Sequence, residues 1–151
     1  MYITELIGDY VEHLEVERGR SKKTAENYER YLLRFHDIAL DVFEQDPKLK
    51  VSKSDDTSDF KPADITPELL RKYRLQLNRE VDRYGENLQT ITQAYHLIAL
   101  RGFLKYLAKR SIDSLDANLV ELPHVIRKQV TFLHYDEVQR LLDSIDTDTE
   151  T

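Results

Sequence analysis

The sequence predicts an all-α protein, a small four-helix bundle followed by a short C-terminal helix. Apolar residues recur at three- and four-residue intervals in several segments, which is the spacing of one face of an α-helix. Residues that start and stop helices stand at the ends of these segments. The chain has 151 residues with 40% hydrophobic content, which supports one core of ordinary size. We therefore expect one domain as the main unit.

The first two helices are defined by their apolar stripes and by the residues between them. Gly19 is expected to end the first helix, and Ser21 is a good N-cap for the second. The first stripe consists of Ile3, Leu6, Ile7, Tyr10 and Leu14. The second consists of Ala25, Tyr28, Leu32, Phe35 and Ala39. We expect the first and second helices to pack against the core through these two apolar stripes.

The third helix is expected to start at Thr66 with Pro67 in its first turn and to stop at Gly85. Its buried face consists of Leu70, Tyr73, Leu77, Val81 and Tyr84. The fourth helix spans residues 87–109 and becomes apolar nearly all round from Leu97 onward, as in a helix surrounded by others. Its first half should expose a polar, uncharged face formed by Gln89, Thr90, Gln93 and His96.

A segment without helical period separates the second and third helices. Residues 41–65 are rich in Asp, Ser, Lys and Pro. They carry no periodic apolar residues that would tie them to the core. We expect a mobile acidic loop here.

Charge is unevenly distributed along the chain. The formal net charge is -6, but residues 18–36 contain six basic and two acidic side chains. On the second helix, Lys23, Asn27, Arg30 and Arg34 recur at intervals that place them on one exposed stripe without an acid. Such a stripe beside a helix N-terminus favours a phosphate group.

Several classes of site are excluded or unsupported by the sequence. The chain has no cysteine, which excludes a disulfide scaffold, a thiolate zinc site and a cysteine nucleophile. Its five histidines show no metal-ligand spacing, and no glycine-rich phosphate loop is present. We expect no metal, no cofactor and no small-molecule substrate. Without a signal peptide or a long apolar run, we expect no membrane association and a cytoplasmic location.

Three parts of the sequence, in this order, resemble the N-terminal core-binding domain of tyrosine recombinases, the Xer and phage-integrase family. The first is the pattern formed by Gly19, Ser21, Thr24 and Tyr28. The second is the series Leu97, Ala99, Leu100, Arg101, Phe103, Tyr106 and Leu107. The third covers residues 122–142 and is similar to the family's interdomain linker and first catalytic-domain helix. His134 departs from the family's usual Ser, Thr or Asp at the start of that helix.

This resemblance implies a SAM-like fold of two crossed helical hairpins that clamps one face of a DNA duplex. Residues 1–110 then form the DNA-binding domain, and residues 111–133 form the interdomain linker. Residues 134–145 form the first helix of a catalytic domain that is otherwise absent, and residues 146–151 form a disordered tail.

In the family, the second and fourth helices approach the major groove of double-stranded DNA. The resemblance therefore implies phosphate contacts from Arg20, Lys22, Lys23, Thr24, Asn27, Arg30 and Arg34. It implies base or groove contacts from Gln89, Thr90, Gln93 and His96. Arginine and lysine position a protein on phosphates, whereas glutamine can bond adenine bidentately. The resemblance also allows self-association with other recombinase protomers on DNA.

The family's catalytic residues lie beyond the end of this sequence, so the resemblance implies that this chain alone is not an enzyme. We identify no candidate catalytic residue in it. The alternative is an all-helical protein-interaction module whose acidic ends suit a basic partner. Duplex binding that weakens steeply with salt is expected only from the DNA-binding protein.

Overall fold

The computed structural model describes residues 2–52, 57–79 and 90–122, which contain four α-helices and no strand. The helices are α1 (Ile3–Val16), α2 (Lys22–Gln45), α3 (Pro67–Arg79) and α4 (Thr90–Lys109). Three 3-10 turns lie between or after them: η1 (Pro47–Leu49), η2 (Pro62–Asp64) and η3 (Ala117–Leu119). The all-α fold class is thereby confirmed. The predicted end of the third helix, Gln89 and the helix expected over 134–145 lie outside the described residues.

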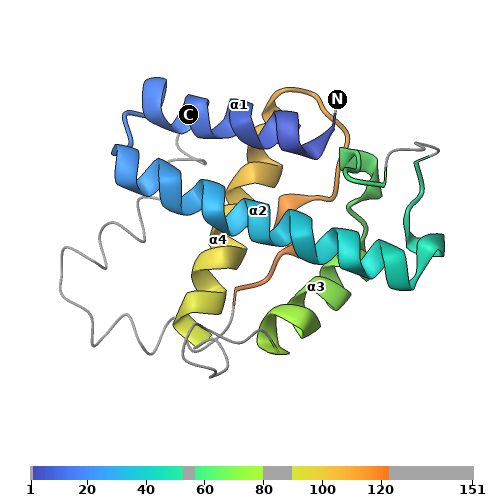
Figure 1. Cartoon of the computed structure of the whole chain (residues 1–151). Helices are drawn as coiled ribbons and strands as arrows, with labels where there is room; N and C mark the ends of the chain where they lie inside the picture. The colour runs from blue at the N-terminus through green and yellow to red at the C-terminus, as the bar shows by residue number, and fades with distance from the viewer. Residues whose placement is uncertain (1, 53–56, 80–89, 123–151) are drawn as a thin grey trace.

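The second helix, α2, contacts each of the other three. Figure 1 shows α1 and α2 running side by side, with α4 crossing steeply behind α2. The first helix ends before Gly19, as predicted. Gly19 lies in the turn between α1 and α2 with a φ of 63°, a left-handed conformation that glycine adopts at little cost. The hydroxyl of Ser21 accepts the N–H of Thr24 at 3.1 Å and caps α2.

The core is formed by the predicted stripes. Phe35 and Tyr73 are fully buried, and their rings meet edge to face with centroids 4.8 Å apart. The second half of α4 is enclosed by its neighbours, as its apolar residues predict. The buried residues of that half include Leu97, Leu100, Phe103, Leu104 and Leu107.

The segment expected to be a mobile acidic loop is partly built into the domain. Residues 41–45 complete α2. Phe60 is fully buried, with its ring centroid 5.3 Å from that of Phe43, and its carbonyl accepts the N–H of Ile3 at 2.8 Å. The lack of periodic apolar residues therefore does not separate this segment from the core, because Phe60 and Ile65 are buried without forming a helical period. Residues 53–56 lie outside the described part.

Two buried carboxylates fasten the same segment. Asp59 lies with one oxygen 3.2 Å from Nε2 of His36, and that oxygen also accepts the N–H of Phe60 at 2.8 Å. Asp64 is fully buried and accepts both the N–H and the hydroxyl of Ser52 at 2.6 Å. Because a buried carboxylate is costly without partners, these bonds explain how the acids of this segment are accommodated.

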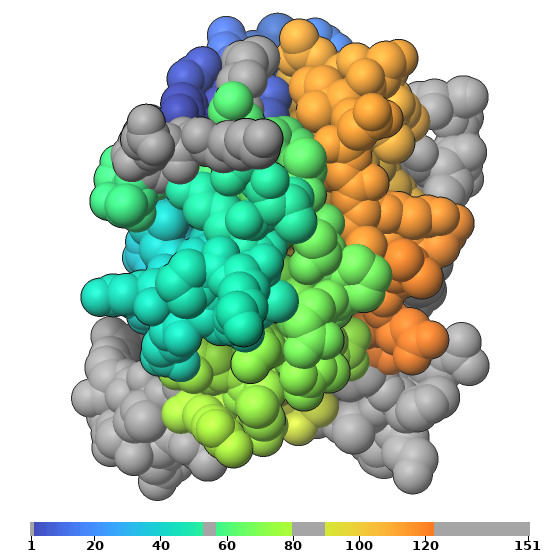
Figure 2. All heavy atoms as spheres, turned by 90° about the vertical axis from the view of Figure 1, so that its right-hand side faces the viewer, coloured from blue at the N-terminus to red at the C-terminus, as the bar shows by residue number. Residues whose placement is uncertain are grey.

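The described part of the predicted linker, residues 111–122, packs against the helices, and we call it the exit strap. Nη1 of Arg74 on α3 donates to the carbonyl of Glu121 at 2.6 Å. Leu122 packs near Ala94, in the second turn of α4. Figure 2 shows the strap in orange, running along the molecule beside the green of α3. The chain therefore turns back after α4 and reaches Leu122 close to the N-terminal half of that helix.

Candidate nucleic-acid interface

The N-terminus of α2 gathers exposed cations around a capped helix start. Lys22 and Lys23 are exposed, and Arg20 is half-buried. Thr24 is engaged by the cap, because its N–H and its hydroxyl both bond the hydroxyl of Ser21. The first N–H groups of a helix have no partners within the helix, and the helix dipole favours an anion there. Lys22 and Lys23 therefore flank a surface suited to a phosphate.

The basic stripe continues along α2 through Asn27 and Arg30. Arg30 is exposed, and its Nη2 donates to Oδ1 of Asn27 at 2.7 Å. Its guanidinium carbon lies 5.8 Å from the centroid of the Tyr31 ring. Arg30 is thus contacted by two neighbours and is still exposed to solvent. Lys23, Asn27 and Arg30 share the face that the sequence predicts.

The structure places Arg34 differently from Arg30. Arg34 is half-buried, and its Nη1 is buried without an acceptor among the described residues. Burial raises the pKa of Tyr73 above its usual range, and the nearby charge of Arg34 acts in the opposite direction. Arg34 therefore lies against the core with part of its guanidinium, and only its outer edge can contribute to a surface contact.

The polar face expected at the start of α4 is only partly present. Thr90 is exposed and Gln93 is half-buried, with its Nε2 donating to Oδ1 of Asn78 on α3 at 3.3 Å. Gln89 lies outside the described residues. The expectation that His96 lies on this outer face is wrong, because it is 3% exposed and covered by Tyr31.

His96 is a buried, neutral side chain between α2 and α4. Its ring centroid lies 4.4 Å from that of Tyr31, and its Nδ1 lies 2.7 Å from the carbonyl of Thr92. The pKa of His96 is lowered to about 4, chiefly by burial and to a lesser extent by the charges of Arg34 and Arg30, while the hydrogen bond to Thr92 acts in the opposite direction. Since the carbonyl can only accept, Nδ1 carries the proton of the neutral ring. No sequence pattern indicates the pairing of His96 with Tyr31, because the two residues lie on different helices.

Acidic side chains border the basic stripe on one side. A hollow of about 460 Å³ on α2 is lined by both arginines of the stripe and by Leu33 and Ile38, together with four carboxylates. These carboxylates belong to Glu26, Glu29, Asp37 and Asp41. Like charges repel, so Asp37 and Asp41 disfavour a polyanion beyond Arg34, and Glu26 and Glu29 disfavour it on this side of the N-terminal half. The basic surface is therefore confined to residues 20–34.

The basic side chains of α3 are partly engaged within the domain. Arg71 bonds the carboxylate of Glu68 through Nη2 at 2.5 Å and Nε at 3.3 Å. This hydrogen bond raises the pKa of Arg71 and lowers the pKa of Glu68. Arg74 holds the exit strap. On α3, the charge of Arg71 is therefore paired with an acid, whereas Arg74 keeps its charge but is held by the strap.

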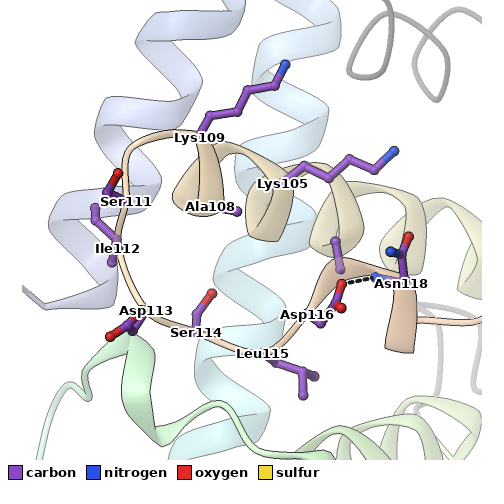
Figure 3. Close-up of a pocket in the computed structure, with 11 residues that line it drawn as sticks. Lys105, Ala108, Lys109, Ser111, Ile112, Asp113, Ser114, Leu115, Asp116 and Asn118 are labelled. Carbon is purple, nitrogen blue, oxygen red and sulfur yellow. Dashed lines mark hydrogen bonds between the residues drawn. The ribbon is translucent and has the colours of Figure 1, made fainter.

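A second hollow, of about 520 Å³, lies where the exit strap leaves α4 (Figure 3). Lys105 and Lys109 extend away from the loop that carries Asp113, and Asp116 accepts the N–H of Asn118 at 2.9 Å. The charged side chains that line this hollow do not point toward a common centre, so they do not form a binding site for one ion. In the described part of the chain, no group of three or more acidic or histidine side chains is arranged to hold a metal ion. No helix there is long and apolar enough to cross a membrane.

Comparisons with known proteins agree with the resemblance seen in the sequence. Residues 7–60 match the family described as "Phage integrase, N-terminal SAM-like domain", a stretch that includes the whole basic stripe. The tyrosine recombinase XerC of Pelotomaculum thermopropionicum is 29% identical over 144 residues, which cover 93% of this chain. The chain spans 41% of the length of that relative. No solved structure matches the chain.

Proposed function

The chain resembles the N-terminal domain of Xer-like tyrosine recombinases, and we propose that it binds double-stranded DNA through the N-terminal half of α2 and the first turns of α4. The observation that carries this proposal is the surface of α2, where Lys22 and Lys23 are exposed at the helix N-terminus and Arg30 is exposed about two turns further along. Cations on a helix face position a protein on the phosphate backbone without reading sequence.

The polar side chains of α4 supply the second part of the proposal. Thr90 and Gln93 lie in the first turns of α4, and Gln89 precedes them in the sequence. The Gln93 amide makes a long bond of 3.3 Å to Asn78, which it could exchange for a base edge. We assign base or groove contacts to Gln89, Thr90 and Gln93. We assign no DNA contact to His96, because its side chain is buried between α2 and α4.

We further propose that this chain alone neither cleaves nor joins DNA. The support for this proposal is that the sequence offers no nucleophile with an activating base beside it. Incubation with a supercoiled plasmid that carries candidate sites tests this point. A covalent adduct between protein and DNA would contradict it.

The binding proposal is tested by titrating a short labelled duplex with the full chain at several salt concentrations. If about three cations neutralise phosphates, the slope of log K against log salt should be about -3. A protein-interaction module would show no duplex binding or a flat salt dependence. Either of those two outcomes would contradict DNA binding.

A further inference from the structure

We propose that Tyr31, backed by His96, is a positioning residue that holds the Arg30 guanidinium at one place on α2 for contact with a DNA phosphate. This inference rests on the proposed function. It adds two residues that do not themselves face the DNA but fix the geometry of one that does.

Arg30 is held by two neighbours on its own helix. Its guanidinium carbon lies 5.8 Å from the centroid of the Tyr31 ring, within the range of a cation–π interaction. Its Nη2 donates to Asn27 at 2.7 Å. A guanidinium has five N–H donors, so one bond to Asn27 leaves a fork for a phosphate. The side chain is exposed and yet restrained.

Tyr31 is in turn held by α4. Its ring lies 4.4 Å from that of His96, centroid to centroid, with 45° between the ring planes. His96 is 3% exposed and is fixed through its Nδ1, which donates to the carbonyl of Thr92 at 2.7 Å. The pKa of His96 is lowered to about 4, chiefly by burial, so near neutral pH the ring adds no positive charge beneath the arginines of α2.

These contacts form a chain from the phosphate-facing surface of α2 to the first turns of α4. It runs from Arg30 through Tyr31 and His96 to Thr92, two residues after Thr90 and one before Gln93. The spacing between the two proposed contact surfaces is therefore set by packed rings and not by free side chains. An arginine that is already held loses less conformational freedom on binding, which strengthens the complex.

The test is a double-mutant cycle in the full chain, with affinity for a short duplex as the measured quantity. Arg30→Ala should weaken binding about tenfold in the wild-type background, as expected for a charge-assisted hydrogen bond. In a Tyr31→Leu background it should weaken binding only about threefold, because an exposed cation–π contact contributes about that factor. Tyr31→Phe keeps the ring and should behave as wild type. Tyr31→Leu should leave the salt slope unchanged, since it removes no charge.

Equal effects of Arg30→Ala in both backgrounds would overturn the inference while leaving DNA binding intact. Loss of binding in Tyr31→Phe equal to that in Tyr31→Leu would overturn it as well. A second measurement depends on neither DNA nor a folded Tyr31→Leu variant. In the wild-type protein, NMR should show upfield ring-current shifts of the Arg30 side-chain protons and restricted motion of its Nε–H. Averaged, random-coil values for that side chain would also refute the positioning role.

Discussion

Acidification should destabilise the protein through His96. Burial lowers the pKa of His96 to about 4 in the folded protein, whereas an unfolded chain has a histidine pKa of about 6.5. The folded state therefore binds the proton less readily than the unfolded state. Its stability is fully present above about pH 6.5 and falls as the pH drops toward 4. At about pH 5 this linkage should cost about 2 kcal/mol of unfolding free energy relative to about pH 7.5.

The matched control is His96→Asn, whose side-chain amide can still donate to the carbonyl of Thr92 but cannot titrate. Urea unfolding followed by circular dichroism at both pH values gives the loss for each protein. All other titratable side chains are present in both proteins, so their contributions cancel in the comparison. The wild type should lose about 2 kcal/mol more than His96→Asn. Equal losses in the two proteins would refute the assignment of His96 as a buried neutral histidine.

Three further substitutions test the packing of the domain. Phe60→Ala should cost about 3 to 5 kcal/mol in chemical unfolding, because it empties a fully buried site, and a cost below about 1 would show that the 59–64 segment does not fill the core. Arg74→Ala should speed amide exchange at Val120 about tenfold by loosening the exit strap, whereas unchanged exchange would contradict the role of the Glu121 bond. Ser21→Ala should cost about 1 kcal/mol through loss of the α2 cap, and unchanged stability would contradict that cap.

The helices, their caps and the exposed end of the basic stripe could be predicted because they are local in the sequence. Ser21 lies three residues from the N–H that it caps, and the spacing from Lys23 to Arg30 is a property of one helix. The first motif of the recombinase resemblance, from Gly19 to Tyr28, also lies within one short stretch of the chain. None of these inferences depends on which helices pack against one another in the folded protein.

The errors concern positions whose environment is set by a distant element. His96 looks like a surface residue by its helical phase, but Tyr31, far from it in the sequence, covers it. Phe60 looks isolated in a polar segment, but the rings of Phe35 and Phe43 enclose it. Arg34 keeps its place on the helix yet buries part of its guanidinium. Side-chain burial depends on tertiary packing, which periodicity along one helix does not specify.

The most direct test of DNA binding through α2 compares two double variants that each remove two positive charges. Lys23→Ala with Arg30→Ala removes them from the basic stripe. Arg71→Ala with Lys109→Ala removes them from α3 and from the end of α4. With a labelled duplex titrated at several salt concentrations, the first pair should make the slope of log K against log salt shallower by about two, and the second should leave it nearly unchanged. Equal changes in both pairs, or a wild type whose binding does not depend on salt, would contradict the account.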